Sequence, residues 1–214
     1  MGDKFEEFEK GVEVPKKSTS KFELIVGGIT IIALLLNLFL IPGSAVFTIL
    51  SLATLSCFYF YFSFAILNSV RLRMIFKKGS FSKITTLRII GAIGVGVNLS
   101  VVLLGILFKT LSWPGASVML MSGLLGLSGS LVVMFVKYSQ NKSSFYVNVF
   151  KRIVLVGGLG AFLFFLPKDA LLEFKYRDSP DYITAVKAVN ADPENEVLQR
   201  NVVELRRKMD EEGE

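Results

Sequence analysis

The stretch from Leu103 to Ser130, LLGILFKTLSWPGASVMLMSGLLGLSGS, decides the fold, because it is an apolar run that reverses at Trp113-Pro114-Gly115. Its two arms, 89–108 and 117–136, each have the length of about 20 apolar residues that a helix needs to cross a hydrocarbon layer about 30 Å thick. Pro114 disfavours a helical conformation at Trp113, Gly115 permits a tight reversal, and an indole ring suits the membrane–water interface. The stretch therefore predicts a transmembrane hairpin with an interfacial turn.

Composition and charge placement extend this prediction to most of the chain. The 214 residues are 52% hydrophobic, with a mean hydropathy of +0.55. All 18 acidic residues fall within 3–23 and 169–214, so that residues 24–168 carry no carboxylate. We interpret 22–167 as a membrane domain between two polar tails, 1–21 and 168–214.

The apolar runs predict an all-α polytopic membrane protein with about five transmembrane helices: two similar hairpins plus one helix. The expected helices cover about 22–41, 45–67, 89–108, 117–136 and 148–167. The fifth apolar core, 153–166, rises only about 21 Å. It spans if 145–150 contributes and Lys151 and Arg152 snorkel. The alternative is a re-entrant or interfacial segment.

An internal repeat relates the two hairpins. A shift of 72 residues (114 − 42) places Pro42-Gly43-Ser44-Ala45-Val46 over Pro114-Gly115-Ala116-Ser117-Val118. Pro42 and Gly43 therefore predict a second interfacial turn of the same design. Both hairpins enter the membrane from the same side, which makes the repeat parallel.

Basic residues predict the orientation. The loops 68–88 and 137–152 carry 10 Lys and Arg residues, whereas the two hairpin turns carry only Lys109. Positively charged loops stay in the cytoplasm, so we expect a bacterial inner-membrane protein with a cytoplasmic N-terminus. If the fifth run spans, the tail after Pro167 is periplasmic; if it is interfacial, the tail is cytoplasmic. We interpret the basic clusters as topology signals and expect no nucleic-acid partner.

The C-terminal tail predicts two short helices, 182–189 and 197–209, separated by Asp192-Pro193-Glu194-Asn195. We expect Asp192 to cap the second helix and Pro193 to occupy its first position. That helix is amphipathic and needs a partner surface to be stable. The tail is therefore the expected contact for a protein partner.

Residues with catalytic potential are scarce. The sequence has no histidine and one cysteine, Cys57, which excludes a disulfide framework and a cysteine zinc site. We expect no enzymatic activity, no cofactor and no ionisable side chain near the middle of a span. The polar residues expected within the membrane are Asn98 and Ser100, which either line an ion or substrate path or form a hydrogen bond between helices.

One resemblance to a known family lies in the second hairpin. The residues concerned are Phe108-Lys109-Thr110-Leu111-Ser112-Trp113-Pro114-Gly115-Ala116 and Met119-Leu120-Met121. They resemble the hairpin of the GldL family, the membrane motor subunit of the Bacteroidota type IX secretion system, and of small membrane proteins from that phylum. The resemblance covers about 30 residues and implies a shared hairpin geometry. An acidic residue within the membrane is expected to couple proton flow in that family, and this chain has none between Glu23 and Asp169.

Two hypotheses for the function follow from the sequence. The first is a non-enzymatic scaffold or accessory subunit of an envelope complex, because residues for catalysis or ion coupling are lacking and the tail needs a partner. The second is a small transporter or channel with its site between the two hairpins, motivated by the parallel repeat and by Asn98.

Overall fold

The computed structural model describes residues 19–70, 74–77, 80–82, 84–140, 143–167 and 169–212. Within these ranges the chain is helical and has no strand, which confirms the predicted fold class. The helices of the membrane domain are α2 (Thr19–Leu38), α3 (Ser44–Ile66), α4 (Thr86–Thr110), α5 (Ala116–Gln140) and the continuous series α6 (Ser144–Arg152), η2 (Ile153–Gly157) and α7 (Gly158–Phe165). Five helices in the described part are long and apolar enough to cross a membrane. The predicted tail 1–21 lies outside the described residues except for its last three.

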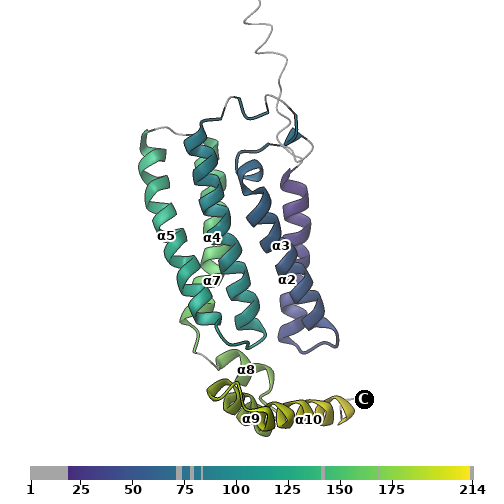
Figure 1. The fold of residues 1–214 in the computed structure, drawn as a ribbon. Helices are drawn as coiled ribbons and strands as arrows, with labels where there is room; N and C mark the ends of the chain where they lie inside the picture. The colour runs from purple at the N-terminus through teal and green to yellow at the C-terminus, as the bar shows by residue number, and fades with distance from the viewer. Residues whose placement is uncertain are drawn as a thin grey trace, which may run out of the picture.

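The bundle is a row of helices with the fifth span packed behind it. Figure 1 shows α5, α4, α3 and α2 in that order, with α7 behind α4, which it contacts together with α5. We call the end with the α3–α4 and α5–α6 connections the loop end. We call the opposite end, with the two hairpin turns, the turn end. The two hairpins α2–α3 and α4–α5 therefore lie side by side and meet through α3 and α4.

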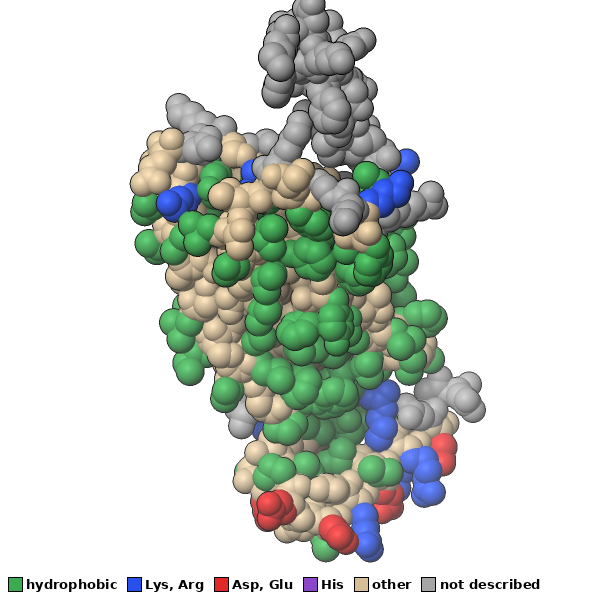
Figure 2. Space-filling view, turned by 45° about the horizontal axis from the view of Figure 1, so that its top comes forward, with side chains coloured by type: hydrophobic (Ala, Val, Ile, Leu, Met, Phe, Trp, Pro, Cys, Tyr) green, Lys and Arg blue, Asp and Glu red, His purple; other side chains and the backbone are tan. Residues whose placement is uncertain are grey.

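The outer surface of the bundle is apolar, as a lipid-facing surface must be. Large hydrophobic side chains are exposed on every span, among them Ile25, Leu50, Ile90, Val132 and Phe162. On the face seen in Figure 2, hydrophobic side chains cover the body of the bundle, and the acidic side chains lie on the tail. Exposed apolar area of this extent marks a membrane surface. The chain is a multi-pass membrane protein.

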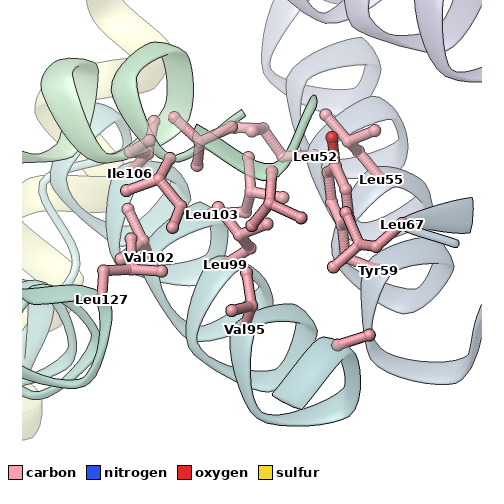
Figure 3. Close-up of a cluster of buried hydrophobic side chains, with 14 of the residues drawn as sticks. Leu52, Leu55, Tyr59, Leu67, Val95, Leu99, Val102, Leu103, Ile106 and Leu127 are labelled. Carbon is pink, nitrogen blue, oxygen red and sulfur yellow. The ribbon is translucent and has the colours of Figure 1, made fainter. Parts of the chain in front are cut away.

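The core lies mainly between α3 and α4. Leu52, Leu55 and Tyr59 of α3 point toward Val95 and Leu99 of α4 in Figure 3, and all five are buried. Because lipid tails are as apolar as leucine, close packing rather than exclusion of water holds such helices together. The hairpins are thus joined by their inner helices.

The fifth apolar run extends further toward the N-terminus than its apolar core alone predicts. The candidate span covers Phe145–Phe165, 21 residues, which is long enough to cross. Its start is set by Ser143, whose hydroxyl accepts a hydrogen bond from the backbone N–H of Phe145 at 3.4 Å. The helices α4 and α5 extend beyond the predicted bounds, because apolar counting stops at the first polar residue whereas a helix continues to its end. The helix α2 ends before its predicted bound, at Leu38, because the chain already reverses at Leu40.

The predicted repeat recurs in the backbone at the ends of α2 and α4. Leu40 and Ser112, 72 positions apart (112 − 40), both have positive φ, 55° and 58°. In each hairpin the next N–H donates to the carbonyl five residues earlier, which are the pairs Ile41 N to Leu36 O (3.1 Å) and Trp113 N to Phe108 O (2.8 Å). This is the Schellman ending of a helix, and its apolar contact is also present, since the Trp113 and Phe108 rings are 5.2 Å apart.

The tail forms three helices at the turn end: α8 (Ala170–Lys175), α9 (Pro180–Ala191) and α10 (Glu196–Glu212). The sequence predicts α9 and α10 but not the short α8. The expected capping by Asp192 and Pro193 is wrong. Asn195 caps α10 instead, because its Oδ1 accepts from the N–H of Val197 at 3.1 Å, while Asp192 ends α9. Pro180 opens α9.

Candidate functional site

An ion pair links three spans near the loop end. Arg152 donates from Nε and from Nη2 to the two carboxylate oxygens of Glu23, each at 2.5 Å. The hydroxyl of Tyr59 donates to the same carboxylate. Glu23 lies on α2, Tyr59 on α3 and Arg152 at the end of α6. The carboxylate therefore connects the first hairpin to the fifth span.

This cluster is buried between helices toward the loop end of the bundle. The side chains of Arg152 and Glu23 are only 18% and 15% exposed. Arg152 is eight residues beyond Ser144, which corresponds to about 12 Å along a helix. The expectation that Arg152 snorkels is therefore wrong, because its guanidinium is paired with Glu23 inside the bundle. Both residues lie in the loop-side half of their spans, Phe145–Phe165 and Lys21–Leu38.

The helix around Arg152 is adapted to hold the guanidinium. Its Nη1 donates to the carbonyl of Asn148, one turn earlier, at 3.0 Å. The residues directly after it, Ile153–Gly157, form a π-helical turn. Such turns change the direction in which side chains project, and they are frequent at functional sites. The guanidinium thus donates back to Asn148 in its own helix and across to Glu23 of α2.

We call Glu23, Tyr59 and Arg152 the clasp, because their hydrogen bonds hold three spans together. The carboxylate of Glu23 accepts from two donors on Arg152 and one on Tyr59, so its acceptor positions are well satisfied. Removing one partner from such a pair leaves an uncompensated charge in an apolar environment, which is strongly destabilising. One feature of the sequence points to this site: Glu23 is the only carboxylate of the first span, and the next acidic residue along the chain is Asp169.

A second polar layer lies at the turn end, where Lys109 and Lys175 meet the ends of helices. Nζ of Lys109 donates to the carbonyls of Leu166 and Pro167 at 3.1 and 3.3 Å. Nζ of Lys175 donates to the carbonyl of Thr110 at 2.6 Å and to the side chain of Asn37. Carbonyls at the C-terminus of a helix carry a partial negative charge and favour cations. The two lysines therefore hold α7 and the tail against the ends of α4 and α2.

The rest of the tail is held to α8 by aromatic contacts. Nη1 of Arg206 on α10 donates to the hydroxyl of Tyr176 at 2.6 Å, and its guanidinium also faces the Tyr176 ring. The ring of Tyr182 on α9 is 4.5 Å from the Tyr176 ring. Tyr176 is thus the point at which all three tail helices meet. The tail finds much of its packing surface within the chain itself.

Lys175 is expected to titrate near neutral pH. Burial, together with the positive charge of Arg206, lowers its pKa from 10.5 to about 8. The undocked tail keeps the ordinary pKa, so the docked tail gains stability as pH rises from about 8 to about 10.5 and loses it again as pH falls from about 10.5 to about 8. Amine labelling quantified by mass spectrometry across this pH range measures the pKa. Arg206→Gln should raise it, and Arg207→Gln, whose arginine is exposed, should leave it unchanged. An ordinary pKa in the intact protein contradicts this prediction.

The predicted turn residues lie together at the turn end, exposed as expected for interfacial positions. They are Pro42, Gly43, Trp113, Pro114 and Gly115. Gly43 and Gly115 have φ values of 77° and 87°, a conformation in which a side chain is strained. Both turns therefore require glycine at the same repeat position.

The Trp113→Ala variant should be less stable than Leu111→Ala. The Trp113 side chain, 43% exposed, rests edge-on against Phe108 and combines apolar area with an N–H donor suited to the interface. Loss of an aromatic pair alone costs about 0.5–1.5 kcal/mol. Thermal unfolding of the full chain in detergent micelles measures the difference. Equal melting temperatures for the two variants would contradict an anchoring role for the indole.

Ser100 lies at the contact between the two hairpins, whereas Asn98 lies at the contact between the two helices of the second hairpin. The hydroxyls of Ser100 and Ser56 are 2.6 Å apart, which bridges the two hairpins. Asn98 donates to the carbonyl of Gly94 in its own helix at 3.0 Å, and its side chain lies against Gly126 of α5. Asn98 is therefore inside the second hairpin, and of these two residues Ser100 alone lies between the hairpins.

The described residues contain no group of three or more His, Cys, Asp or Glu side chains that could hold a metal ion. Cys57 is exposed and free. No protein-family model matches the chain, and the comparisons with curated proteins and with solved structures find no similar protein or fold.

Proposed function

We propose that this protein is a non-enzymatic scaffold or accessory subunit of an envelope complex, embedded in a bacterial inner membrane. In this proposal the membrane bundle is a rigid base, and the C-terminal tail presents a surface to a protein partner. The main support is the way the tail is mounted. Lys175 and Lys109 hold the start of the tail against the ends of α2 and α4. The outer face of α10, in contrast, is exposed.

The outer face of α10 has the character of a protein-binding surface. It consists of Glu196, Gln199, Arg200, Val203, Glu204 and Arg207. Val203 is 68% exposed at its centre, and the charged side chains on both sides of it are exposed as well. Charges surrounding an apolar residue favour a partner helix with complementary charges.

The proposed orientation places the loop end in the cytoplasm and the tail in the periplasm. The excess of Lys and Arg in the loops supports this direction, and five spans put the two termini on opposite sides. The resemblance of the second hairpin to the GldL family supports an envelope complex of the kind found in Bacteroidota.

The packing between the hairpins favours a scaffold over the alternative of a transporter. Ser56 and Ser100 bond across the contact of α3 with α4, and a side-chain carbon added at Gly96 would lie 2.0 Å from Ser63. Helices in such close contact leave no room for a substrate. Substrate flux in proteoliposomes that is lost in Asn98→Leu would overturn the scaffold proposal in favour of transport.

Affinity purification of the full chain after crosslinking in the native cell tests the partner proposal. We expect one protein in fixed stoichiometry, lost in the Arg200→Glu/Arg207→Glu variant and retained in Arg177→Glu. Arg177 is equally exposed but lies outside α10, so it controls for a general change in charge. Equal recovery of the partner with both variants contradicts binding through α10.

The orientation is tested by cysteine labelling. A cysteine at position 178, where the Asp178 side chain is 92% exposed, is introduced in a Cys57→Ser background. It should react with a membrane-impermeant maleimide in intact spheroplasts. Labelling only after lysis would place the tail, and its partner, in the cytoplasm.

A further inference from the structure

The second hairpin is closed at one end and open at the other. A Cβ atom added at Gly105 or Gly123 would lie 2.8 or 2.7 Å from a side chain of the opposite helix, so α4 and α5 are in close contact there. A Cβ at Gly91, Gly94 or Gly129 would meet nothing within 4 Å. The space between α4, α5 and α6 is a groove of about 660 Å³.

This groove has an apolar floor and a polar mouth. The floor is made of glycine and aliphatic side chains, including Gly94, Val95, Val133 and Val149. The mouth is formed by Thr85, Arg88, Lys137, Ser143 and Tyr146 at the loop ends of the same helices. Its volume lies in the range of about 300–1,000 Å³ that is typical of small-molecule sites. An occupant must therefore be apolar along most of its length and polar at one end.

Among the described residues, no carboxylate forms an ion pair with Arg88 at this mouth. Its guanidinium carbon lies 4.0 Å above the centre of the Phe145 ring, which fixes its position. Its Nε atom is buried and has no hydrogen-bond partner among the described residues. A buried donor without a partner is unfavourable, and the groove is where a partner would fit.

The rest of the mouth is also positive. Lys137 is exposed at the end of α5, and its Nζ lies 3.5 Å from the amide oxygen of Gln140. The first turn of α4 contains no acidic residue, and within the described residues the side chain of Thr85 makes no capping hydrogen bond. The start of that helix carries a partial positive charge, which attracts anions.

The membrane domain cannot neutralise these charges itself. The sequence has no carboxylate between Glu23 and Asp169, and Glu23 is held by Arg152. Arg88 lies in the first turn of one span and Lys137 in the last turn of the next, which is the level of lipid headgroups. An anion that lies in the membrane surface matches these charges.

We propose that this groove binds a glycerophospholipid with an anionic headgroup. The lipid phosphate contacts Arg88 and Lys137, and an acyl chain lies along the floor between α4 and α5. Basic pockets between transmembrane helices are a known way of selecting anionic lipids. This lipid site is independent of the protein partner proposed for the tail.

Native mass spectrometry and thermal unfolding of the full chain in detergent micelles test the site, with phosphatidylglycerol or phosphatidylcholine added. We expect one retained phosphatidylglycerol and a higher melting temperature with that lipid alone. Arg88→Gln and Lys137→Gln should each weaken its binding about tenfold, because each removes a charge-assisted contact. Lys151→Gln, which removes an exposed charge at the same end but outside the groove, should bind as the unmodified chain does.

A second variant separates lipid binding from folding. Gly129→Leu places a side chain in open space within the groove, so the protein should fold and lose the bound lipid. The proposal is overturned if both lipids bind equally, if Lys137→Gln and Gly129→Leu retain phosphatidylglycerol, or if inorganic phosphate at the same concentration raises the melting temperature as much as the lipid does.

Discussion

Replacing Gly96 with alanine should separate the two hairpins. A Cβ atom at this position of α4 would lie 2.0 Å from Cβ and 2.1 Å from Oγ of Ser63, and 2.7 Å from the backbone oxygen of Tyr59. A rotamer change cannot relieve a contact with the Cβ and backbone atoms of α3, so the helices must move apart. We expect a loss of about 3 kcal/mol in the free energy of unfolding, at the upper end for overpacking.

Gly94 provides the matched control for this variant. It lies two residues earlier in the same helix, and a Cβ there meets nothing within 4 Å. Gly94→Ala should therefore be neutral or slightly stabilising, since alanine favours a helix over glycine by about 1 kcal/mol. Unfolding of both variants by a denaturing detergent measures the difference. A Gly96→Ala protein as stable as Gly94→Ala would show that α3 and α4 are not in close contact at Ser63.

Breaking the clasp between Glu23 and Arg152 should have an effect of similar size. Arg152→Met removes both donors at 2.5 Å and leaves the carboxylate of Glu23 only the Tyr59 hydroxyl. Removing one member of a buried pair costs about 3–5 kcal/mol, because the other charge stays without compensation. The same measurement should show this loss in Arg152→Met and a smaller one in the double variant Glu23→Gln/Arg152→Met, in which no charge is left.

Lys151 is the control for the clasp, because it is the neighbouring basic residue and its side chain is exposed. Lys151→Met removes the same charge from the same helix without touching Glu23, so its stability should be close to that of the unmodified chain. The pair would not act as a clasp if Arg152→Met were no less stable than Lys151→Met. The same would follow if the double variant lost as much stability as the single variants Glu23→Gln and Arg152→Met lose together.

The two hairpin turns were predictable because their signals are local. Proline restricts the backbone conformations of its own position and of the residue before it, whereas glycine permits additional ones. The same Schellman ending recurs at Leu40 and Ser112. Each hairpin reverses the chain once, so the turns with Pro42 and Pro114 must lie at the same end of the bundle. The matching positive φ values of Leu40 and Ser112, neither of which is glycine, could not be read from their residue types.

The polar contacts were less predictable, because their partners are far apart in the chain. Arg152 looked like a snorkelling residue beside Lys151, and only the placement of α2 against the fifth span, 129 residues away, provides its carboxylate. Likewise, Lys175 belongs to a helix that the sequence did not predict, and it bonds to Thr110, 65 residues away. Hydropathy describes each residue's affinity for water or lipid but contains no information about which polar groups will meet.

The sequence by itself determined that this chain is an all-α membrane protein built from two related hairpins and a fifth apolar run, which it left open as either a span or an interfacial segment. The length of an apolar run, the residues of a turn and the location of charges act through the bilayer and the local backbone, so they need no knowledge of packing. Only the tertiary structure decided that Glu23 and Arg152 form a clasp, that Asn98 lies within a hairpin, and that Arg88 lies at the mouth of a groove. These depend on how helices rotate and approach one another, which small residues such as Gly96 and Gly126 set through close contacts across the bundle.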